Sequence, residues 1–147
     1  MNMMVIHGPN LNLLGTRKPE IYGKKTLNEI NSEILCYAKE NNIKVEIFQS
    51  NSESEIIDLL HKSKEIFQSQ GIVLNPAAYT HYSYAIADAV EAIEIPVVEV
   101  HLSNIHGREE FRRKSVIAPF AMGQVSGFGG HGYILAMDAL LNKKRRG

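Results

Sequence analysis

The chain has 147 residues and a mass of 16.5 kDa, with 44% hydrophobic and 22% charged residues, which fits one globular domain and excludes a disordered chain. Lys and Arg together number 16, as do Asp and Glu together, so no net positive field would attract nucleic acid. The apolar runs are too short to span a membrane. The single cysteine, Cys36, excludes an internal disulfide framework, and no signal peptide opens the chain, so we expect a cytoplasmic protein with neither a nucleic-acid nor a membrane partner.

The predicted secondary structure alternates between strands and helices. Strands are predicted where Val and Ile form short apolar runs or alternate with polar residues: 3–6, 44–49, 71–74, 96–100 and 124–126. Helices are predicted where a capping pattern or helical spacing precedes an apolar stripe: 27–38, 53–60, 81–93, about 108–114 and 133–141. Two of these starts are capping boxes, with Thr26 followed by Glu29 and Ser52 followed by Glu55.

Two segments fall outside this alternation. Residues 8–25 contain several Gly and Pro residues without a sustained period and exceed an ordinary connection in length. We therefore predict a functional loop there, with a mobile active-site part at about 15–25. Residues 143–147 are predicted to form a basic, solvated tail, and because no linker or repeat interrupts the chain, we expect a single domain over 1–147.

The alternation over this length predicts an α/β, flavodoxin-like, three-layer fold with a five-stranded parallel sheet. Ligands of such folds bind at the carboxyl ends of the strands. Polar residues are concentrated there: Asn10, Arg17 and Tyr22 follow the first predicted strand, Asn75 and His81 the third, and His101, Ser103, Arg108 and Arg112 the fourth.

Arg17 and Tyr22 lie in the predicted mobile loop. An adjacent guanidinium favours the phenolate form of a tyrosine, which could then act as a base. The alternative is a surface arginine and a tyrosine that packs the loop.

Glu99 and His101 are two apart on a predicted strand, so their side chains point to the same face. A carboxylate in that position can orient an imidazole and favour its charged form, which suits a general acid. An unrelated pair at the end of a strand is the alternative.

A turn at Leu102 and Ser103 leads into the segment with Arg108 and Arg112. Free backbone N–H groups at such a turn, with arginines behind them, suit a carboxylate or phosphate. A capped helix with solvated arginines is equally compatible with this pattern. His81 and Asp88, seven residues apart, would lie two turns apart on one face of the helix predicted over 81–93.

Three other features do not predict a site. The glycines of 127–132 match a dinucleotide motif by letter, but too few residues follow for the required βαβ unit. His101 and His106 are five apart and lack the spacing of a metal site. Cys36 lies on an apolar helical stripe, and we expect it to be buried and inert.

The chain closely resembles type II 3-dehydroquinate dehydratase. The resemblance covers essentially its whole length and rests on four blocks: HGPNLNLLGTRKPEIYG (7–23), LNPAAYTHYSYAIADAV (74–90), VVEVHLSNIHGREEFRRKS (97–115) and GQVSGFG (123–129). It implies conversion of 3-dehydroquinate to 3-dehydroshikimate, the third step of the shikimate pathway, by anti elimination of water through an enolate. It also implies no metal or organic cofactor, and a homododecamer assembled as a tetramer of trimers.

The resemblance also implies a role for each matching residue. Tyr22 would remove a proton from C2, Arg17 would stabilise the phenolate and the enolate-like transition state, and Asn10 would hold a water near the enolate. His101, oriented by Glu99, would protonate the departing C1 hydroxyl. The implied substrate-binding residues are Asn75, His81, Asp88 from a neighbouring subunit, the backbone of Leu102 and Ser103 for the carboxylate, and Arg112 for a ring hydroxyl.

Two positions depart from the family pattern. Lys18 follows the loop arginine where an acid is common, and Ala77 follows Asn-Pro where glycine is common. Because alanine keeps its backbone N–H, we expect the water or substrate contact at position 77 to survive if φ is negative.

Three other functions are compatible with parts of the pattern. A lysine Schiff base on the same substrate would use Lys18, Lys24 or Lys25. A flavodoxin-like module that binds a flavin or nucleotide would need a phosphate loop after the first strand, where Pro9 and apolar residues stand instead. A purely structural oligomer would leave Tyr22, Glu99 and His101 without a role.

Overall fold

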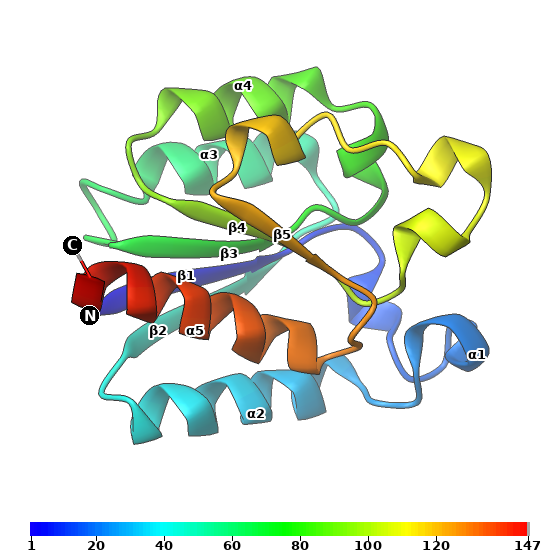
Figure 1. Cartoon of the computed structure of the whole chain (residues 1–147), viewed down its shortest axis with the longest axis horizontal. Helices are drawn as coiled ribbons and strands as arrows, with labels where there is room; N and C mark the ends of the chain where they lie inside the picture. The colour runs from blue at the N-terminus through cyan, green and yellow to red at the C-terminus, as the bar shows by residue number, and fades with distance from the viewer. Residues whose placement is uncertain (147) are drawn as a thin grey trace.

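The computed structural model describes residues 1–146, and the side chains of 1–145. One sheet of five parallel strands lies at its centre, in the order β2-β1-β3-β4-β5 (Figure 1). The strands are β1 (Asn2–His7), β2 (Lys44–Gln49), β3 (Gly71–Asn75), β4 (Val97–His101) and β5 (Gly123–Ser126). This is the flavodoxin-like strand order, and the predicted fold is confirmed.

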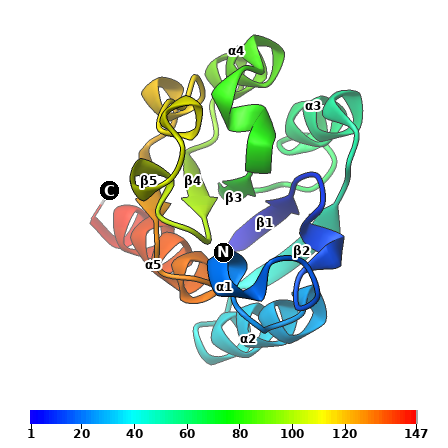
Figure 2. The same cartoon turned by 90° about the vertical axis from the view of Figure 1, so that its right-hand side faces the viewer.

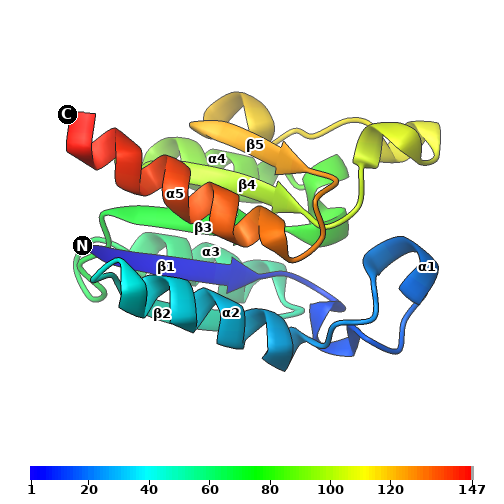
Figure 3. The same cartoon turned by 60° about the horizontal axis from the view of Figure 1, so that its bottom comes forward.

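Helices cover both faces of the sheet. The helices are α1 (Pro19–Tyr22), α2 (Leu27–Glu40), α3 (Glu53–Lys62), α4 (Tyr84–Ala92) and α5 (His131–Arg146). Figures 1 and 3 show α2 and α5 on one face and α3 and α4 on the other. The alternation of side chains along β1 explains the three layers. Met3 and Val5 belong to the hydrophobic core shared with α2 and α5, whereas Met4 and Ile6 belong to the core shared with α3 and α4.

Both predicted capping boxes are present at helix starts. The Thr26 hydroxyl accepts a hydrogen bond from the Glu29 N–H at 3.2 Å, and the Ser52 hydroxyl accepts one from the Glu55 N–H at 3.3 Å. These side chains satisfy N–H groups that have no partner inside the helix, which fixes where α2 and α3 begin.

The start predicted for the helix over 81–93 is wrong, because this helix begins later in the structure. His81 instead ends a 3-10 turn, η2 (Ala77–His81), and α4 begins at Tyr84 because the Ser83 hydroxyl accepts from the Ile86 N–H at 3.1 Å. His81 and Asp88 therefore do not share a helical face. The helix predicted at about 108–114 is also wrong, since that segment contains the 3-10 turn η4 (Glu110–Arg112), which follows another, η3 (Ile105–Gly107).

Three further predictions at the surface need correction. The loop over 8–25 contains a 3-10 turn, η1 (Leu11–Leu13), and the short helix α1. The predicted tail at 143–147 continues α5 as far as Arg146, with Lys143 exposed as expected, and Gly147 lies outside the described residues. Cys36 is exposed rather than buried, because the buried stripe of α2 runs through Ile30 and Ile34 on another face. No described helix is both long and apolar enough to cross a membrane.

Candidate active site

The carboxyl ends of β1, β3 and β4 meet at one edge of the sheet, between α1 and the turns at 105–112 (Figure 2). A pocket of about 480 Å³, open to solvent, lies there. Nine predicted site residues line it: Asn10, Arg17, Tyr22, Asn75, His81, His101, Leu102, Ser103 and Arg112. The remaining lining residues are Pro9, Leu11, Ala77, Ala78, Ile105 and Arg108. The polar residues that the sequence places after three strands are thus brought together.

His101 stands on the pocket wall with Glu99 behind it. Its Nε2 is hydrogen-bonded to Glu99 Oε2, as expected for residues two apart on one strand. Glu99 is fully buried and does not line the pocket, so it can reach a ligand only through His101. Because Nε2 is occupied, Nδ1 is the ring nitrogen left for a ligand.

The Glu99 carboxylate is enclosed by hydrogen-bond donors that sequence reasoning missed. Oε2 accepts from the Thr80 hydroxyl and the Gln124 amide, each at 2.8 Å, and Oε1 accepts from the Ser115 hydroxyl at 2.8 Å. Burial by itself would raise the pKa of Glu99, but the bonds from His101, Gln124 and Thr80 lower it overall. The buried carboxyl group is therefore held in its charged form beside His101.

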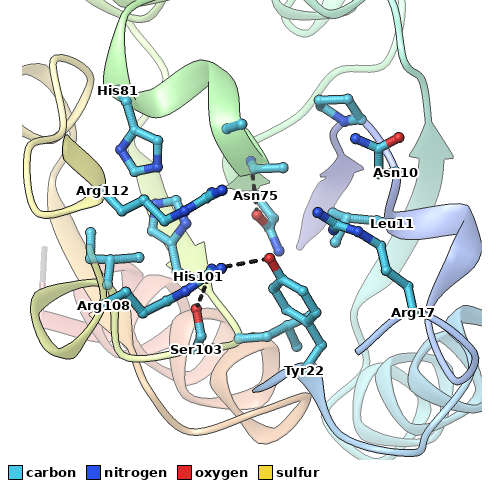
Figure 4. A pocket seen from close by; sticks show the side chains of 15 residues that line it. Asn10, Leu11, Arg17, Tyr22, Asn75, His81, His101, Ser103, Arg108 and Arg112 are labelled. Carbon is cyan, nitrogen blue, oxygen red and sulfur yellow. Dashed lines mark hydrogen bonds between the residues drawn. The ribbon is translucent and has the colours of Figure 1, made fainter. Parts of the chain in front are cut away.

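Tyr22 lies at the end of α1, and two arginines contact it. The guanidinium carbon of Arg17 lies 4.8 Å from the ring centroid, over the face of the ring. Arg108 Nη1 donates a hydrogen bond to the phenol oxygen at 3.0 Å and also reaches the Ser103 hydroxyl at 3.4 Å (Figure 4). The cation on the reactive oxygen is therefore Arg108, which the sequence pattern places only among possible anion ligands.

Two asparagines line the pocket from the ends of β1 and β3. Asn10 has a left-handed backbone (φ 68°), which asparagine tolerates well, and its N–H donates to Asn51 Oδ1 at 3.0 Å. Asn75 is 2% exposed, and its Oδ1 accepts the backbone N–H of Ala77 at 3.0 Å. Ala77 has a φ of 49°, so the condition set for its N–H is not met, and that N–H is used within the protein.

His81 and Arg112 approach from the outer wall. His81 Nδ1 is 2.8 Å from the carbonyl oxygen of Lys114, to which it donates, so Nε2 remains free to accept. Burial lowers the pKa of His81 against the opposing effect of its hydrogen bond to the Lys114 carbonyl, and the positive charge of Arg112 acts in the same direction as burial. Arg112 Nε lies 2.7 Å from Glu109 Oε2, with which it forms an ion pair.

Asp88 lies apart from the pocket. It is exposed on α4 and does not line the cavity of its own chain. The role expected for it depends on a second subunit.

The residues of the pocket give no support to a lysine Schiff base or to a metal site. Lys18, Lys24 and Lys25 are not among the described residues that line it. Within residues 1–146, no three His, Cys, Asp or Glu side chains are grouped so that they could hold a metal ion.

The missed residues share one cause. Gln124 lies directly opposite Glu99 in the pairing of β5 with β4, and only that register brings its amide to the carboxylate. Arg108 is 86 residues from Tyr22 in the chain. The one sequence feature that could have indicated these residues is their place near the predicted strands. Gln124 lies on the last predicted strand, and Arg108 lies shortly after the fourth.

The chain is similar to known proteins over nearly its whole length. The family model for dehydroquinase class II matches residues 1–141. A curated 3-dehydroquinate dehydratase from Clostridium perfringens is 58% identical over 97% of this chain and 99% of its own length. One from Halothermothrix orenii is 54% identical over 97% of this chain and 95% of its own length.

A solved structure agrees with these relatives. The crystal structure of type II dehydroquinase from Butyrivibrio crossotus has a TM-score of 0.94 and 48% identity, covering 96% of this chain and 97% of that one. Sequence and three-dimensional structure therefore indicate the same family. The chain belongs to the class II dehydroquinase family.

Proposed function

We propose that this chain dehydrates 3-dehydroquinate to 3-dehydroshikimate by anti elimination through an enolate, at the pocket between α1 and β4. Its family makes the chain a hydro-lyase with 3-dehydroquinate as substrate. The observation that carries the proposed mechanism is that one pocket holds a tyrosine whose oxygen contacts a guanidinium and a histidine backed by a buried carboxylate.

In the first step, the Tyr22 oxygen takes the proton from C2, and the electrons of that C–H bond move onto the C3 carbonyl to give an enolate. Arg108 donates to the same tyrosine oxygen, and Arg17 lies over the ring, so two guanidinium groups lie at the proposed base. Asn10 would hold a water that stabilises the negative charge of the enolate.

In the second step, the enolate electrons form the C1=C2 double bond while the C1–O bond breaks. His101 donates a proton to the departing hydroxyl, which leaves as water. The carboxylate on Nε2 stabilises the imidazolium, whose Nδ1–H is free for this transfer. Acid and base belong to different elements, His101 to β4 and Tyr22 to α1.

The other lining residues would hold the substrate. Its carboxylate would lie at the backbone of Leu102 and Ser103, a ring hydroxyl at Arg112, and further oxygens at Asn75 and His81. Asp88 would contribute from a neighbouring subunit of the predicted homododecamer. The dodecamer, the cytoplasmic location, the absence of a cofactor and the mobile loop at 15–25 remain predictions.

The direct test follows the ultraviolet absorbance of the conjugated product after 3-dehydroquinate is mixed with protein in EDTA. Wild type should produce it, Tyr22→Phe should not, and Tyr37→Phe, which removes a hydroxyl bonded to Asp138 outside the pocket, should behave as wild type. A folded wild type without turnover would refute the activity, and equal activity in Tyr22→Phe would refute the base.

Stereochemistry is tested with 3-dehydroquinate deuterated on one face of C2. Anti elimination loses the hydrogen on the face opposite the C1 hydroxyl and retains the other. Loss of the hydrogen on the same face as the hydroxyl would contradict the proposed mechanism. Borohydride added with substrate should leave activity intact, whereas a lysine Schiff base would be trapped.

A further inference from the structure

Four side chains form a chain of hydrogen bonds behind the pocket, and the proposed reaction uses only one of them. His7 Nδ1 is 2.8 Å from the Tyr133 hydroxyl, and His7 Nε2 is 2.8 Å from Asn31 Oδ1. The Tyr133 hydroxyl also accepts from Asn75 Nδ2 at 2.9 Å. His7 and Tyr133 are fully buried, so a missing partner could not be replaced by bulk water.

Donors and acceptors in this chain of hydrogen bonds can be assigned in only one direction. Asn75 Oδ1 accepts the Ala77 N–H, so Nδ2 must face Tyr133 and donate to its oxygen. Among the described residues, the one polar group left for the Tyr133 proton is His7 Nδ1, which must therefore be unprotonated. His7 then carries its proton on Nε2 and donates to Asn31 Oδ1.

The charge state of the buried groups agrees with that direction. Burial lowers the pKa of His7 to about 4, against the opposing effect of the Asn31 hydrogen bond. Burial also raises the pKa of Tyr133. At neutral pH the histidine is thus neutral and the tyrosine keeps its proton, as the chain of donors requires.

This chain of hydrogen bonds links four secondary-structure elements and ends at Asn75, a residue of the pocket. Asn31 belongs to α2, His7 ends β1, Tyr133 belongs to α5 and Asn75 ends β3. An asparagine held on one side only could turn its amide over and present an oxygen where a nitrogen had been. With Tyr133 on Nδ2 and Ala77 on Oδ1, that exchange would break both bonds.

We propose that His7 and Tyr133 are positioning residues that fix the Asn75 amide, so that its second Nδ2 hydrogen serves as a donor to an oxygen of the substrate. This inference rests on the proposed function, because it takes Asn75 as a ligand of 3-dehydroquinate. It assigns a purpose to a buried histidine and tyrosine that neither transfer a proton in the reaction nor touch the pocket.

The test compares Tyr133→Phe with Tyr37→Phe. Both remove a single phenol hydroxyl from the layer of α2 and α5, but the Tyr37 hydroxyl bonds Asp138 at the surface. Because Asn75 would bind ground state and transition state alike, Tyr133→Phe should raise KM about fivefold with kcat within about twofold. Tyr37→Phe should change neither constant.

A double-mutant cycle tests the route of the effect. If Tyr133 acts through Asn75, adding Tyr133→Phe to Asn75→Ala should raise KM by less than about twofold beyond Asn75→Ala alone. Equal KM values for Tyr133→Phe and Tyr37→Phe, or full additivity in the cycle, would overturn the inference. Should Tyr133→Phe not fold, His7→Asn, which keeps an acceptor near the Nδ1 position, should show a smaller rise in KM than His7→Leu.

A second measurement separates this inference from the proposed function. In protein labelled with nitrogen-15 at histidine, the His7 resonances, identified by their absence in His7→Asn, should show an unprotonated Nδ1 and a protonated Nε2 at neutral pH. A protonated Nδ1 would overturn the inference even in an active enzyme. Absence of turnover in a folded wild type would instead refute the proposed function.

Discussion

Replacing Gln124 by methionine tests how the buried carboxylate of Glu99 is kept charged. The Gln124 amide donates to Glu99 Oε2 at 2.8 Å, and methionine has similar length without a donor. A hydrogen bond to a charged group contributes about 1.5–3 kcal/mol, and a change of one in pKa corresponds to about 1.36 kcal/mol. Because Glu99 is fully buried, Gln124→Met should raise the pKa of Glu99 by about one to two.

The sign of the effect follows from which form of the Glu99 carboxyl group its donors stabilise. The bonds from His101, Gln124 and Thr80 bring the pKa of Glu99 below its ordinary value despite burial. Removing one donor makes the carboxylate take up a proton at higher pH, so His101 loses its charged partner there. The pH at which the Glu99 carboxylate takes up its proton should therefore move higher by about one.

The assay follows the side-chain carboxyl signal of Glu99 against pH by carbon-13 NMR in wild type, Gln124→Met and Gln70→Met, with that signal identified by its absence in Glu99→Gln. Gln70 makes its hydrogen bonds to Asn2 and Lys144 at the opposite end of the sheet, so its substitution should leave the Glu99 titration unchanged. Coincident Glu99 titrations for Gln124→Met and wild type would refute the argument that the donors around Glu99 set its charge.

Three further substitutions have defined outcomes. Arg108→Ala removes the donor to the Tyr22 oxygen and should lower kcat by about 10- to 100-fold with a smaller change in KM in steady-state assays; equal losses in both would contradict its role. Ala77→Gly relieves a left-handed alanine (φ 49°) and should stabilise the fold by about 0.5 kcal/mol in urea unfolding, whereas a destabilised variant would show that the methyl packing dominates. Ser52→Ala removes the cap of α3 and should cost about 1 kcal/mol in the same measurement, and an unchanged midpoint would contradict the cap.

The sequence predicts the sheet well because strand residues carry their own signal. Val and Ile runs closed by turn residues place all five strands within about one or two residues of where they lie. The start of α4 could not be placed in this way. A short 3-10 turn after Asn75 has no hydrophobic period of its own, and the capping hydroxyl of Ser83, not the first polar residue, decides where the helix begins.

The position of the site was also predictable, whereas its internal contacts were not. Carboxyl ends of parallel strands share one edge, so polar residues after each strand must converge there. Which donors reach Glu99 depends on strand register and on loop conformation. The support behind Asn75 comes from His7 and Tyr133, which the sequence shows only as the end of a strand and the start of a helix.

The two arginines at Tyr22 show why closeness in sequence misleads about chemistry. Arg17 precedes Tyr22 by five residues and lies over its ring, whereas Arg108 comes from the turns after β4 and contacts the oxygen. A phenolate carries its negative charge mainly on the oxygen. A hydrogen bond donated to that oxygen therefore stabilises the charge more than a cation placed over the ring does. Tyr22 therefore acquires both arginine contacts only when the segment after β1 lies beside the segment after β4. The order of strands in the sheet brings these two segments together.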